Sequence, residues 1–184
     1  MVLVVRWDEI KDAGLTLDGQ ESVGSFPALE TLERSGECQF VSPVQVSLRL
    51  YPAGGMVEVT GQAQVSLLLS CGRCLSDYEV DLVAPVELTV VREVPQVEPE
   101  EGEDELELSA EEMGLVHFEG EEIDLHDTIA EHLIVGLPLR PLCQEECKGL
   151  CPVCGTDLNR GTCVCSPGGF MNKFAALKDF KVQE

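Results

Sequence analysis

Positive charge is scarce in this sequence. Its 184 residues hold 12 Lys and Arg against 34 Asp and Glu, a formal net charge of −22. Such an excess repels phosphate at long range, so the whole surface is not suited to grip nucleic acid or anionic lipid. A run of about eighteen apolar residues is also missing, and we expect no membrane-spanning helix and no membrane partner. The first fourteen residues lack a basic segment and a small-residue cleavage site, so we expect no secretory signal.

Motifs of catalytic sites are missing as well. The sequence has no glycine-rich phosphate loop and no nucleophile elbow. Its acidic pairs gather in a stretch where nothing would shift their pKa values. His126 and His132 would point about 240° apart on a helix and cannot share a metal from one face. These two histidines, and the isolated His117, are therefore expected to be surface residues rather than ligands. We therefore predict no enzymatic activity and no small-molecule substrate.

The negative charge is concentrated in one segment. Residues 93–131 hold sixteen acidic side chains and no basic one, and the densest part is residues 98–105. Runs of like charge repel themselves and stay solvated, which predicts an acidic linker over residues 93–122. This divides the chain into a mainly β part at 1–92, the linker, and a C-terminal module at 123–184. The alternative is that the acidic segment is a docking strip for a basic partner.

Alternating apolar and polar residues predict an α+β fold, with an antiparallel β-meander or small barrel before the linker. No helical crossovers are visible there, which excludes a doubly wound parallel sheet. Pro85 indicates an edge strand or a bulge. Asp124 is the expected N-cap of the helix at 123–134. The predicted strands cover residues 44–50, 56–60, 63–67, 78–83 and 86–91, and the predicted helices cover 27–34, 123–134 and 170–180.

Nine cysteines are present, and eight of them form four closely spaced pairs. A Cys-x2-Cys turn places two thiolates about 3.7 Å apart, as tetrahedral zinc requires with Zn–S bonds of about 2.3 Å. Eight thiolates without a credible His or carboxylate ligand predict two closed sites, hence two structural Zn²⁺ ions per chain. Arg73, Arg140, Lys148 and Arg160 would partly offset their negative charge. The predicted ligands are Cys71, Cys74, Cys143, Cys147, Cys151, Cys154, Cys163 and Cys165.

Two arrangements of the pairs are open. In the preferred one, Cys151, Cys154, Cys163 and Cys165 share a metal, because neighbouring pairs need less ordering of the chain. Cys71, Cys74, Cys143 and Cys147 then form a second site that joins the β part to the C-terminal module across the acidic linker. In the other, the two Cys-x2-Cys turns share one metal and the remaining four cysteines share the other.

Rival chemistries fit less well. A redox dithiol at Cys71 and Cys74 would normally open a helix after a strand, whereas this pair lies between two predicted strands. An iron–sulfur cluster would need a ferredoxin spacing that is absent. Cys38 stands outside the pairs and is expected to be a small buried residue.

The sequence resembles the bacterial and plastid YceD-like family, the large ribosomal RNA subunit accumulation proteins. The resemblance covers about residues 40–180, with Lys173 standing where the family would have proline. The matching elements are Cys71-x2-Cys74, Ile123-Asp124-Leu125, Glu131, Leu137-Pro138-Leu139-Arg140-Pro141-Leu142-Cys143, Cys147 to Asn159, Cys163-Val164-Cys165 and Asn172 to Leu177. It implies a cytoplasmic, non-enzymatic accessory factor in large-subunit biogenesis and 23S ribosomal RNA accumulation.

Charge then suggests how such a factor would act. The first hypothesis is that the acidic strip binds a basic ribosomal protein or assembly factor of the large subunit, while the zinc module sets the docking geometry. The second is direct contact with ribosomal RNA through the near-neutral C-terminal module. The third is a zinc-thiolate redox sensor. The basic residues available to the second hypothesis are Lys148, Arg160, Lys173, Lys178 and Lys181.

Overall fold

The computed structural model describes residues 2–93 and 114–165. These residues form a mixed α/β fold with two sheets and two α-helices. The chain divides into a sheet unit, Met1–Leu69 with Tyr78–Leu139, and a cysteine unit, Ser70–Asp77 with Arg140–Glu184. The acidic run at 98–105 and the helix predicted at 170–180 lie outside the described residues.

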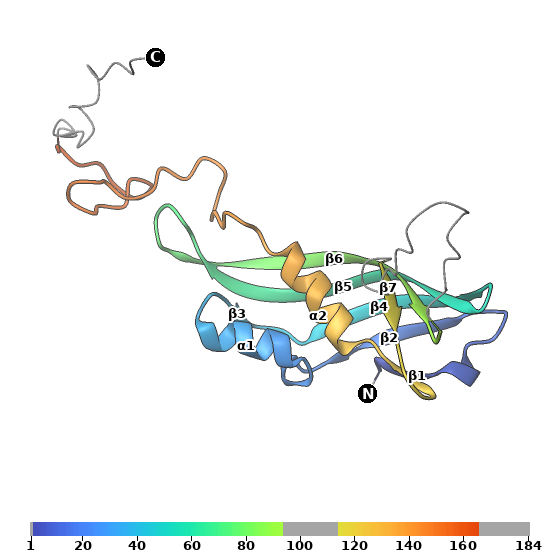
Figure 1. Cartoon of the computed structure of the whole chain (residues 1–184). Coiled ribbons are helices and arrows are strands. Elements are labelled where there is room, and N and C mark those ends of the chain that lie inside the picture. Colours follow the sequence, from blue (N-terminus) through green and yellow to red (C-terminus); the bar gives the residue numbers. More distant parts are fainter. Residues whose placement is uncertain (1, 94–113, 166–184) are drawn as a thin grey trace, which may run out of the picture. The chain divides into compact units, whose positions relative to one another are not determined.

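The main sheet of the sheet unit has six strands (Figure 1). Its order is β2-β4-β5-β6-β7, and β3 pairs with β5 off this path. The order runs from one edge to another, so among residues 2–93 and 114–165 the strands form an open sheet and not the predicted small barrel. The strands are β2 (Leu15–Glu21), β3 (Gln39–Phe40), β4 (Val44–Ala53), β5 (Met56–Ser70), β6 (Asp77–Val91) and β7 (Leu115–His117).

The long strands follow the alternation of the sequence. Along β4, Val44, Val46, Leu48 and Leu50 are buried while the residues between them are exposed. Consecutive strands β4, β5 and β6 are neighbours, as in a meander, and β2 and β4 are antiparallel. One pairing departs from the antiparallel prediction, because β7 runs parallel to β6.

Strand lengths differ from the sequence prediction. The patterns at 56–60 and 63–67 form one strand, β5, which continues through Gly61. A Cβ at Gly61 would lie 2.1 Å from the backbone oxygen of Ser47, so close strand approach requires glycine here. Likewise β6 continues through Pro85, and β7 pairs only with Thr89–Val91. Within the described residues Pro85 therefore lies on an edge portion of β6, where its missing N–H is tolerated.

The described part of the unit also contains two α-helices, α1 (Pro27–Ser35) and α2 (His126–Gly136), and α2 lies across the sheet in Figure 1. The helices contact each other, and Leu29, Ile129 and Leu133 join the buried sheet residues in one hydrophobic core. Short 3-10 turns occur at Trp7–Glu9 and Val23–Ser25. None of the helices in the described part of the chain is long and apolar enough to cross a membrane.

The start of α2 differs from the prediction in two respects. The helix begins at His126 rather than at 123, because residues Glu122–Asp124 form β8, which pairs with β1 (Val4–Arg6). Leu125, not Asp124, is the N-cap residue. The carboxylate of Asp124 still accepts a hydrogen bond from the His126 N–H at 3.0 Å. Strand β7 and the start of β8 thus fall within the range 93–122.

His126 is buried, and its predicted surface position is wrong. Its ring nitrogens face the carboxylates of Glu21, at 3.0 Å, and Asp124. Glu21 is also buried and accepts hydrogen bonds from the backbone N–H groups of Val2 and Leu3. A histidine between two carboxylates satisfies its polar atoms inside the protein, and its sequence position alone does not reveal this. His117 is exposed, and His132 is partly buried.

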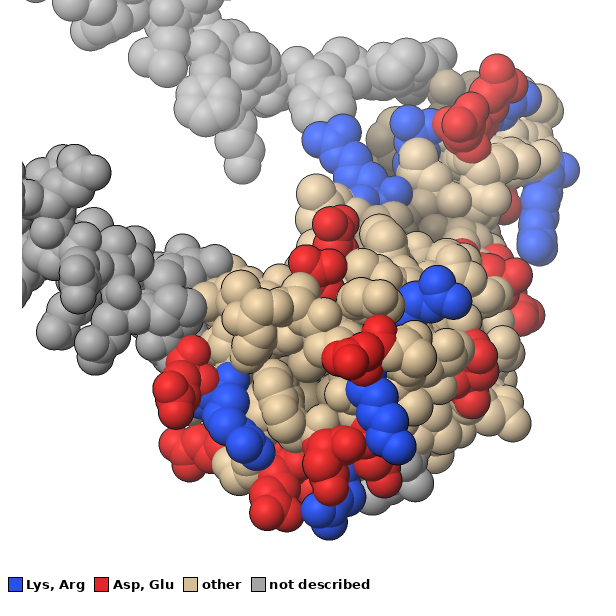
Figure 2. Space-filling view, turned by 90° about the vertical axis from the view of Figure 1, so that its right-hand side faces the viewer, with Lys and Arg blue, Asp and Glu red and all other residues tan. Residues whose placement is uncertain are grey.

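On the face shown in Figure 2, Lys and Arg side chains are interspersed with Asp and Glu. No extended patch of one sign is visible on that face. The densest negative charge of the sequence lies in residues 94–113, outside the described residues.

Candidate metal centres

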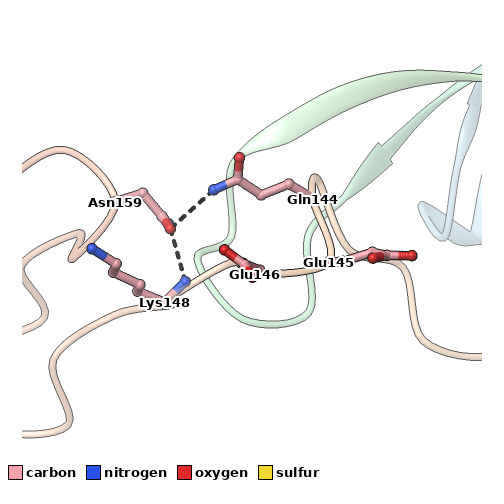
Figure 3. Close-up of a pocket in the computed structure, with 5 residues that line it drawn as sticks. All are labelled: Gln144, Glu145, Glu146, Lys148 and Asn159. Atoms are coloured by element: carbon pink, nitrogen blue, oxygen red, sulfur yellow. Dashed lines mark hydrogen bonds between the residues drawn. The ribbon is translucent and has the colours of Figure 1, made fainter.

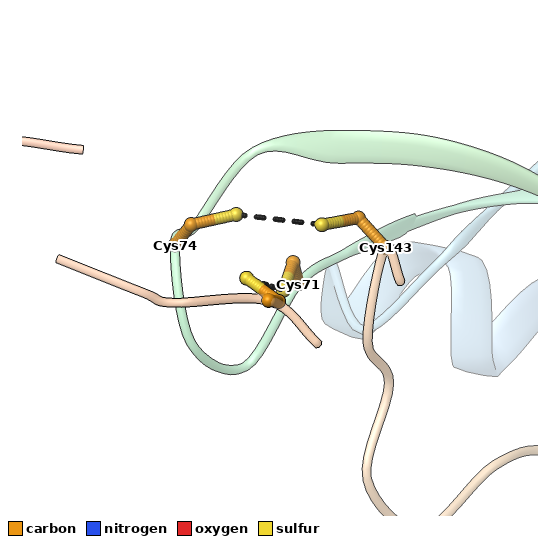
Figure 4. Close-up of side chains that lie close together, drawn as sticks. Cys71, Cys74 and Cys143 are labelled. Atoms are coloured by element: carbon orange, nitrogen blue, oxygen red, sulfur yellow. Dashed lines mark hydrogen bonds between the residues drawn. The ribbon is translucent and has the colours of Figure 1, made fainter. Parts of the chain in front are cut away.

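The first cluster of four thiols joins the β5–β6 loop to the segment after residue 140. Cys71 and Cys74 come from the loop, and Cys143 and Cys147 come from that segment. All four Sγ atoms lie within 4.8 Å of one another. The Cys71–Cys147 and Cys74–Cys143 sulfur pairs are each 3.7 Å apart, and Figure 4 shows Cys74 and Cys143 pointing toward each other. These separations match tetrahedral zinc, whose ligand sulfurs lie about 3.7 Å apart.

The second cluster lies further along the same unit. Cys151, Cys154, Cys163 and Cys165 bring their sulfur atoms within 4.8 Å of one another. It is more open than the first cluster, since Cys154 is exposed and only Cys151 is buried, whereas three cysteines of the first cluster are buried. The ninth cysteine, Cys38, is buried in the hydrophobic core of the sheet unit, and burial raises the pKa of its thiol.

The two Cys-x2-Cys turns have the same backbone structure. In each, the residue after the second cysteine donates its N–H to the carbonyl of the first: Leu75 to Cys71 and Gly155 to Cys151, both at 2.9 Å. That residue has a left-handed backbone conformation in both turns, with φ of 58° at Leu75 and 73° at Gly155. The first cysteine of each turn also receives an N–H at its sulfur, from Arg73 and from Val153, both at 3.5 Å.

A hydroxyl group accompanies the second cysteine of each turn. The Ser76 Oγ lies 2.9 Å from the Cys74 sulfur, and the Thr156 Oγ1 lies 3.1 Å from the Cys154 sulfur. Donors aimed at sulfur stabilise the thiolate, which is the form that binds a metal. The sequence carries this repeat as Cys71-Gly-Arg-Cys-Leu-Ser76 and Cys151-Pro-Val-Cys-Gly-Thr156, so aligning the two turns would have identified both hydroxyl residues.

The thiols of each cluster differ widely in acidity. The backbone N–H of Cys143 lowers the pKa of Cys71 to about 6, while burial raises the pKa of Cys143 to about 12. In the second cluster the Thr156 hydroxyl lowers the pKa of Cys154 to about 6, and the hydrogen bond with Cys154 raises the pKa of Cys165 to about 12. Four negative charges therefore do not coexist unaided in either cluster. A divalent cation would replace the protons and allow all four thiolates.

The described residues of the cysteine unit form almost no hydrophobic core. All buried residues of the main hydrophobic core belong to the sheet unit. Among the described residues of the cysteine unit, the buried side chains are Cys71, Cys74, Cys147 and Cys151. A segment that buries mainly sulfur needs another source of folding free energy, and metal–thiolate bonds supply it in small modules. The donor set and its burial therefore fit a bound metal ion at each cluster.

Arg73 forms hydrogen bonds that hold the two chain segments of the first cluster together. Its guanidinium donates to the carbonyl oxygens of Glu145, at 3.2 Å, and Cys147, at 2.9 Å. The N–H of Gly72 donates to the carbonyl of Pro141 at 2.8 Å. These bonds join the two chain segments that supply the thiols, and Arg73 also offers positive charge close to them.

Asn159 lies on the turn between Cys154 and Cys163 and contacts the first cluster. Its Nδ2 donates to the Cys147 sulfur at 3.3 Å. Figure 3 shows its amide oxygen between Lys148 and Gln144, beside a polar surface pocket of about 470 Å³. Ligand spacing gives no role to Asn159, although the segment that resembles the family extends from Cys147 to Asn159.

The structure brings together all eight predicted cysteines, in the first of the two arrangements considered. Of the basic residues named from the sequence, Arg73, Arg140, Lys148 and Arg160 are exposed. Lys173, Lys178 and Lys181 lie outside the described residues.

Comparison with known proteins places these cysteines within a family. The sequence model of the large ribosomal RNA subunit accumulation protein YceD matches residues 59–181, which include all eight clustered cysteines. The chain belongs to the YceD family. The resemblance predicted from the cysteine and proline pattern is thereby confirmed.

Relatives of this chain occur in bacteria and plants. An uncharacterized protein of Mycobacterium tuberculosis is 32% identical over 115 residues, 62% of this chain and 51% of the relative. The chloroplastic large ribosomal RNA subunit accumulation protein YCED homolog 1 of Zea mays is 28% identical over 156 residues, 74% of this chain and 53% of the relative. The Arabidopsis thaliana protein of the same name is 27% identical over 142 residues, 67% of this chain and 44% of the relative.

The chain thus spans about half the length of the curated relatives it matches. No solved structure matches it.

Proposed function

We propose that this chain is a non-enzymatic accessory factor in large ribosomal subunit biogenesis that promotes accumulation of the large-subunit ribosomal RNA. Membership of the YceD family supports this proposal, and the plant relatives carry that role in their names. The observation that carries the structural part is the pair of four-thiol clusters. Four thiolates leave a tetrahedral zinc ion without an open position for water or substrate, so each ion would be structural.

In this proposal the zinc ions replace a hydrophobic core. The ions, bound by Cys71, Cys74, Cys143 and Cys147 and by Cys151, Cys154, Cys163 and Cys165, would hold the cysteine unit in one conformation. Zinc is favoured over other divalent ions because soft thiolate ligands in a closed tetrahedral set suit it. We assign the function to the cytoplasm, because clustered cysteines in a reducing compartment bind metal more often than they form disulfides.

The proposed partner is a basic ribosomal protein or assembly factor of the large subunit. The support is the charge distribution, since residues 93–131 hold sixteen acidic side chains and no basic one. Complementary charge speeds association and makes it sensitive to salt. Direct binding of RNA through the cysteine unit is the competing outcome, and it would use exposed residues such as Lys148 and Arg160.

Metal content and partner can be measured on one sample. The full chain, purified by affinity from its own cells, is analysed for zinc and for bound proteins and RNA. We expect about two zinc ions per chain and co-purification of large-subunit proteins. A zinc content near zero would overturn the structural-zinc part of the proposal.

The role of the acidic segment requires a separate variant. Changing the acidic residues between 98 and 112 to Gln or Asn should abolish the salt-sensitive capture of a basic ribosomal protein and leave the zinc content unchanged. A variant with Glu58 and Glu87 neutralised, both exposed on the sheet unit, is the control and should retain capture. Retained capture by the segment variant, or RNA binding that survives moderate salt, would count against the acidic strip as the docking site.

The cellular role has its own test. Cells lacking the gene should accumulate less large-subunit ribosomal RNA relative to small-subunit ribosomal RNA, and the wild-type chain should restore the ratio. Cys147→Ser and Cys151→Ser, each of which breaks one cluster, should restore it poorly. Cys38→Ala, which leaves both clusters intact, should restore it fully.

A further inference from the structure

Asn159 links the two thiol clusters through a single side chain. It lies on the turn of residues 155–162, which the second cluster closes on both sides through Cys154 and Cys163. Its amide reaches the sulfur of Cys147, a member of the first cluster, at 3.3 Å.

The side-chain amide of Asn159 forms four hydrogen bonds. Its Nδ2 donates to the Cys147 sulfur and to the Oδ1 of Asp157, the latter at 2.8 Å. Its oxygen accepts from the Lys148 N–H at 2.8 Å and from the Gln144 side chain at 3.4 Å, as Figure 3 shows. Two donors and two acceptor positions are thus satisfied, so the geometry of this turn is tightly specified.

Backbone hydrogen bonds also connect the turn of the second cluster to the segment between the two clusters. The Leu158 N–H donates to the Gly149 carbonyl at 2.9 Å, and Leu150 forms an isolated antiparallel bridge with Asp157. Gly149 lies midway between Cys147 of the first cluster and Cys151 of the second. It is left-handed, and a Cβ there would lie 2.9 Å from the Arg73 carbonyl oxygen. The turn of the second cluster therefore packs on a segment that the first cluster requires.

We propose that Asn159 is a positioning residue that couples the two metal sites, so that metal bound at the second cluster strengthens metal binding at the first. The inference rests on the proposed structural zinc. Closing the second cluster orders the turn and removes the entropy cost of bringing the Asn159 amide to Cys147. The N–H···S bond then stabilises the thiolate that the first metal requires. By thermodynamic linkage, metal at the first cluster strengthens binding at the second by the same factor.

A double-mutant cycle on the full chain tests the coupling. Co²⁺ replaces zinc as the probe, because its thiolate charge-transfer absorption reports each site, and a competing chelator gives the affinities. The variants are Asn159→Ala, a Cys163→Ser/Cys165→Ser double variant that disables the second cluster, and their combination. Asn159→Ala should weaken the first site by about 10–100-fold, the usual effect of losing a group that bonds a ligand.

Disabling the second cluster should weaken the first site by about 5–150-fold in the wild-type background. In the Asn159→Ala background it should add less than about threefold. Equal losses in both backgrounds would overturn the proposal, because the two changes would then act independently.

Two further variants separate the effect of the hydrogen bond from Asn159 to the Cys147 sulfur from the effect of side-chain packing in the turn. Asn159→Asp keeps an acceptor for the Lys148 N–H but cannot donate to Cys147, so it should shift the charge-transfer band of the first site to longer wavelength. Thr162→Ala changes the same turn at an exposed side chain, and it should leave the band and the affinity of the first site unchanged. A band unmoved by Asn159→Asp would overturn the role assigned to the amide.

The outcomes also separate this inference from the proposed function. A wild-type chain that binds no Co²⁺ and no zinc defeats both. A chain that binds two ions with affinities unaffected by Asn159→Ala retains the structural-metal proposal and loses the coupling alone.

Discussion

At the scale of single residues, the buried ion-pair network of His126 has the clearest consequence for stability. The imidazole lies between Glu21 and Asp124, with 4% of its surface exposed. Burial lowers the pKa of His126, but the hydrogen bonds with Glu21 and Asp124 outweigh it and leave the pKa raised. The hydrogen bond from His126 and those from the backbone leave the pKa of Glu21 lowered in spite of its burial.

His126→Ala should destabilise the sheet unit by about 3–5 kcal/mol, because it leaves the Glu21 carboxylate buried without its partner. Urea unfolding followed by the fluorescence of the single tryptophan measures this. His132→Ala on the same helix is the control and should cost less, since His132 is only partly buried. Adding Glu21→Gln to the His126 variant should recover part of the loss, and additive losses would contradict the pairing.

The same pair predicts a pH dependence. A raised histidine pKa contributes stability that is complete below the ordinary value of 6.5 and is lost as the pH rises through the folded-state pKa. The lowered Glu21 pKa contributes stability above the ordinary value of 4.5 and loses it as the pH falls through the folded-state value. The stability difference between wild type and His126→Gln should therefore shrink from pH 6.5 upward. A difference that grows with pH would contradict a charged His126.

Leu75 and Gly155 occupy equivalent left-handed positions in the two cysteine turns. A side chain in that conformation costs about 1–2 kcal/mol, and the Leu75 side chain is 69% exposed. Leu75→Gly should therefore keep or raise the metal affinity of the first cluster, while Gly155→Leu should lower that of the second by about tenfold. Chelator competition measures both, and a loss of affinity in Leu75→Gly would show that the exposed leucine is itself required for the turn.

At the scale of elements, the close approach of β4 and β5 depends on Gly61. Its missing Cβ leaves room for the Ser47 carbonyl of β4. Gly61 lies between the two patterns, 56–60 and 63–67, that the sequence predicts as separate strands and that form the single strand β5. Gly61→Ala should destabilise the sheet by about 1–3 kcal/mol through crowding, measured by urea unfolding. Gly24→Ala is the matched control, since its nearest neighbour would be 3.7 Å away, and it should change stability by less than about 0.5 kcal/mol. Equal effects would contradict the crowding.

Elements with strong alternation were predictable, and short or irregular ones were not. The strand pattern at 44–50 and the helix at 27–34 coincide closely with β4 and α1. Strand β2 was missed although its residues alternate, because Gly19 and Asp18 disfavour a strand locally while pairing with β4 stabilises it. Strands β7 and β8 have three residues each, too few for a periodic signal. The N-cap at Asp124 was predicted from residue type, but the pairing of β8 with β1 keeps Asp124 in a strand.

At the scale of the whole molecule, the two units depend on different forces. The sheet unit buries a continuous apolar core, whereas the cysteine unit buries cysteine side chains within its described residues. Removing metal with a strong chelator under reducing conditions should therefore unfold the cysteine unit and leave the sheet unit folded. Limited proteolysis should then cut within 140–165 while the sheet core persists, and far-ultraviolet circular dichroism should keep its strand signal. Loss of both units together would contradict this independence.

The sequence by itself identified the eight paired cysteines and, from the low cost of joining neighbouring pairs, favoured one of two arrangements. It also determined the family, through a pattern of cysteines and prolines that covers most of the chain. The tertiary structure decided between the two arrangements, because the first cluster joins pairs that are far apart in the chain. Only the tertiary structure decided that the two Cys-x2-Cys turns repeat one hydrogen-bonding scheme, that Asn159 reaches across to Cys147, and that His126 is buried between carboxylates. These contacts join residues up to 105 positions apart in the sequence. Contacts between such distant residues form only when the strands and turns that carry them pack together.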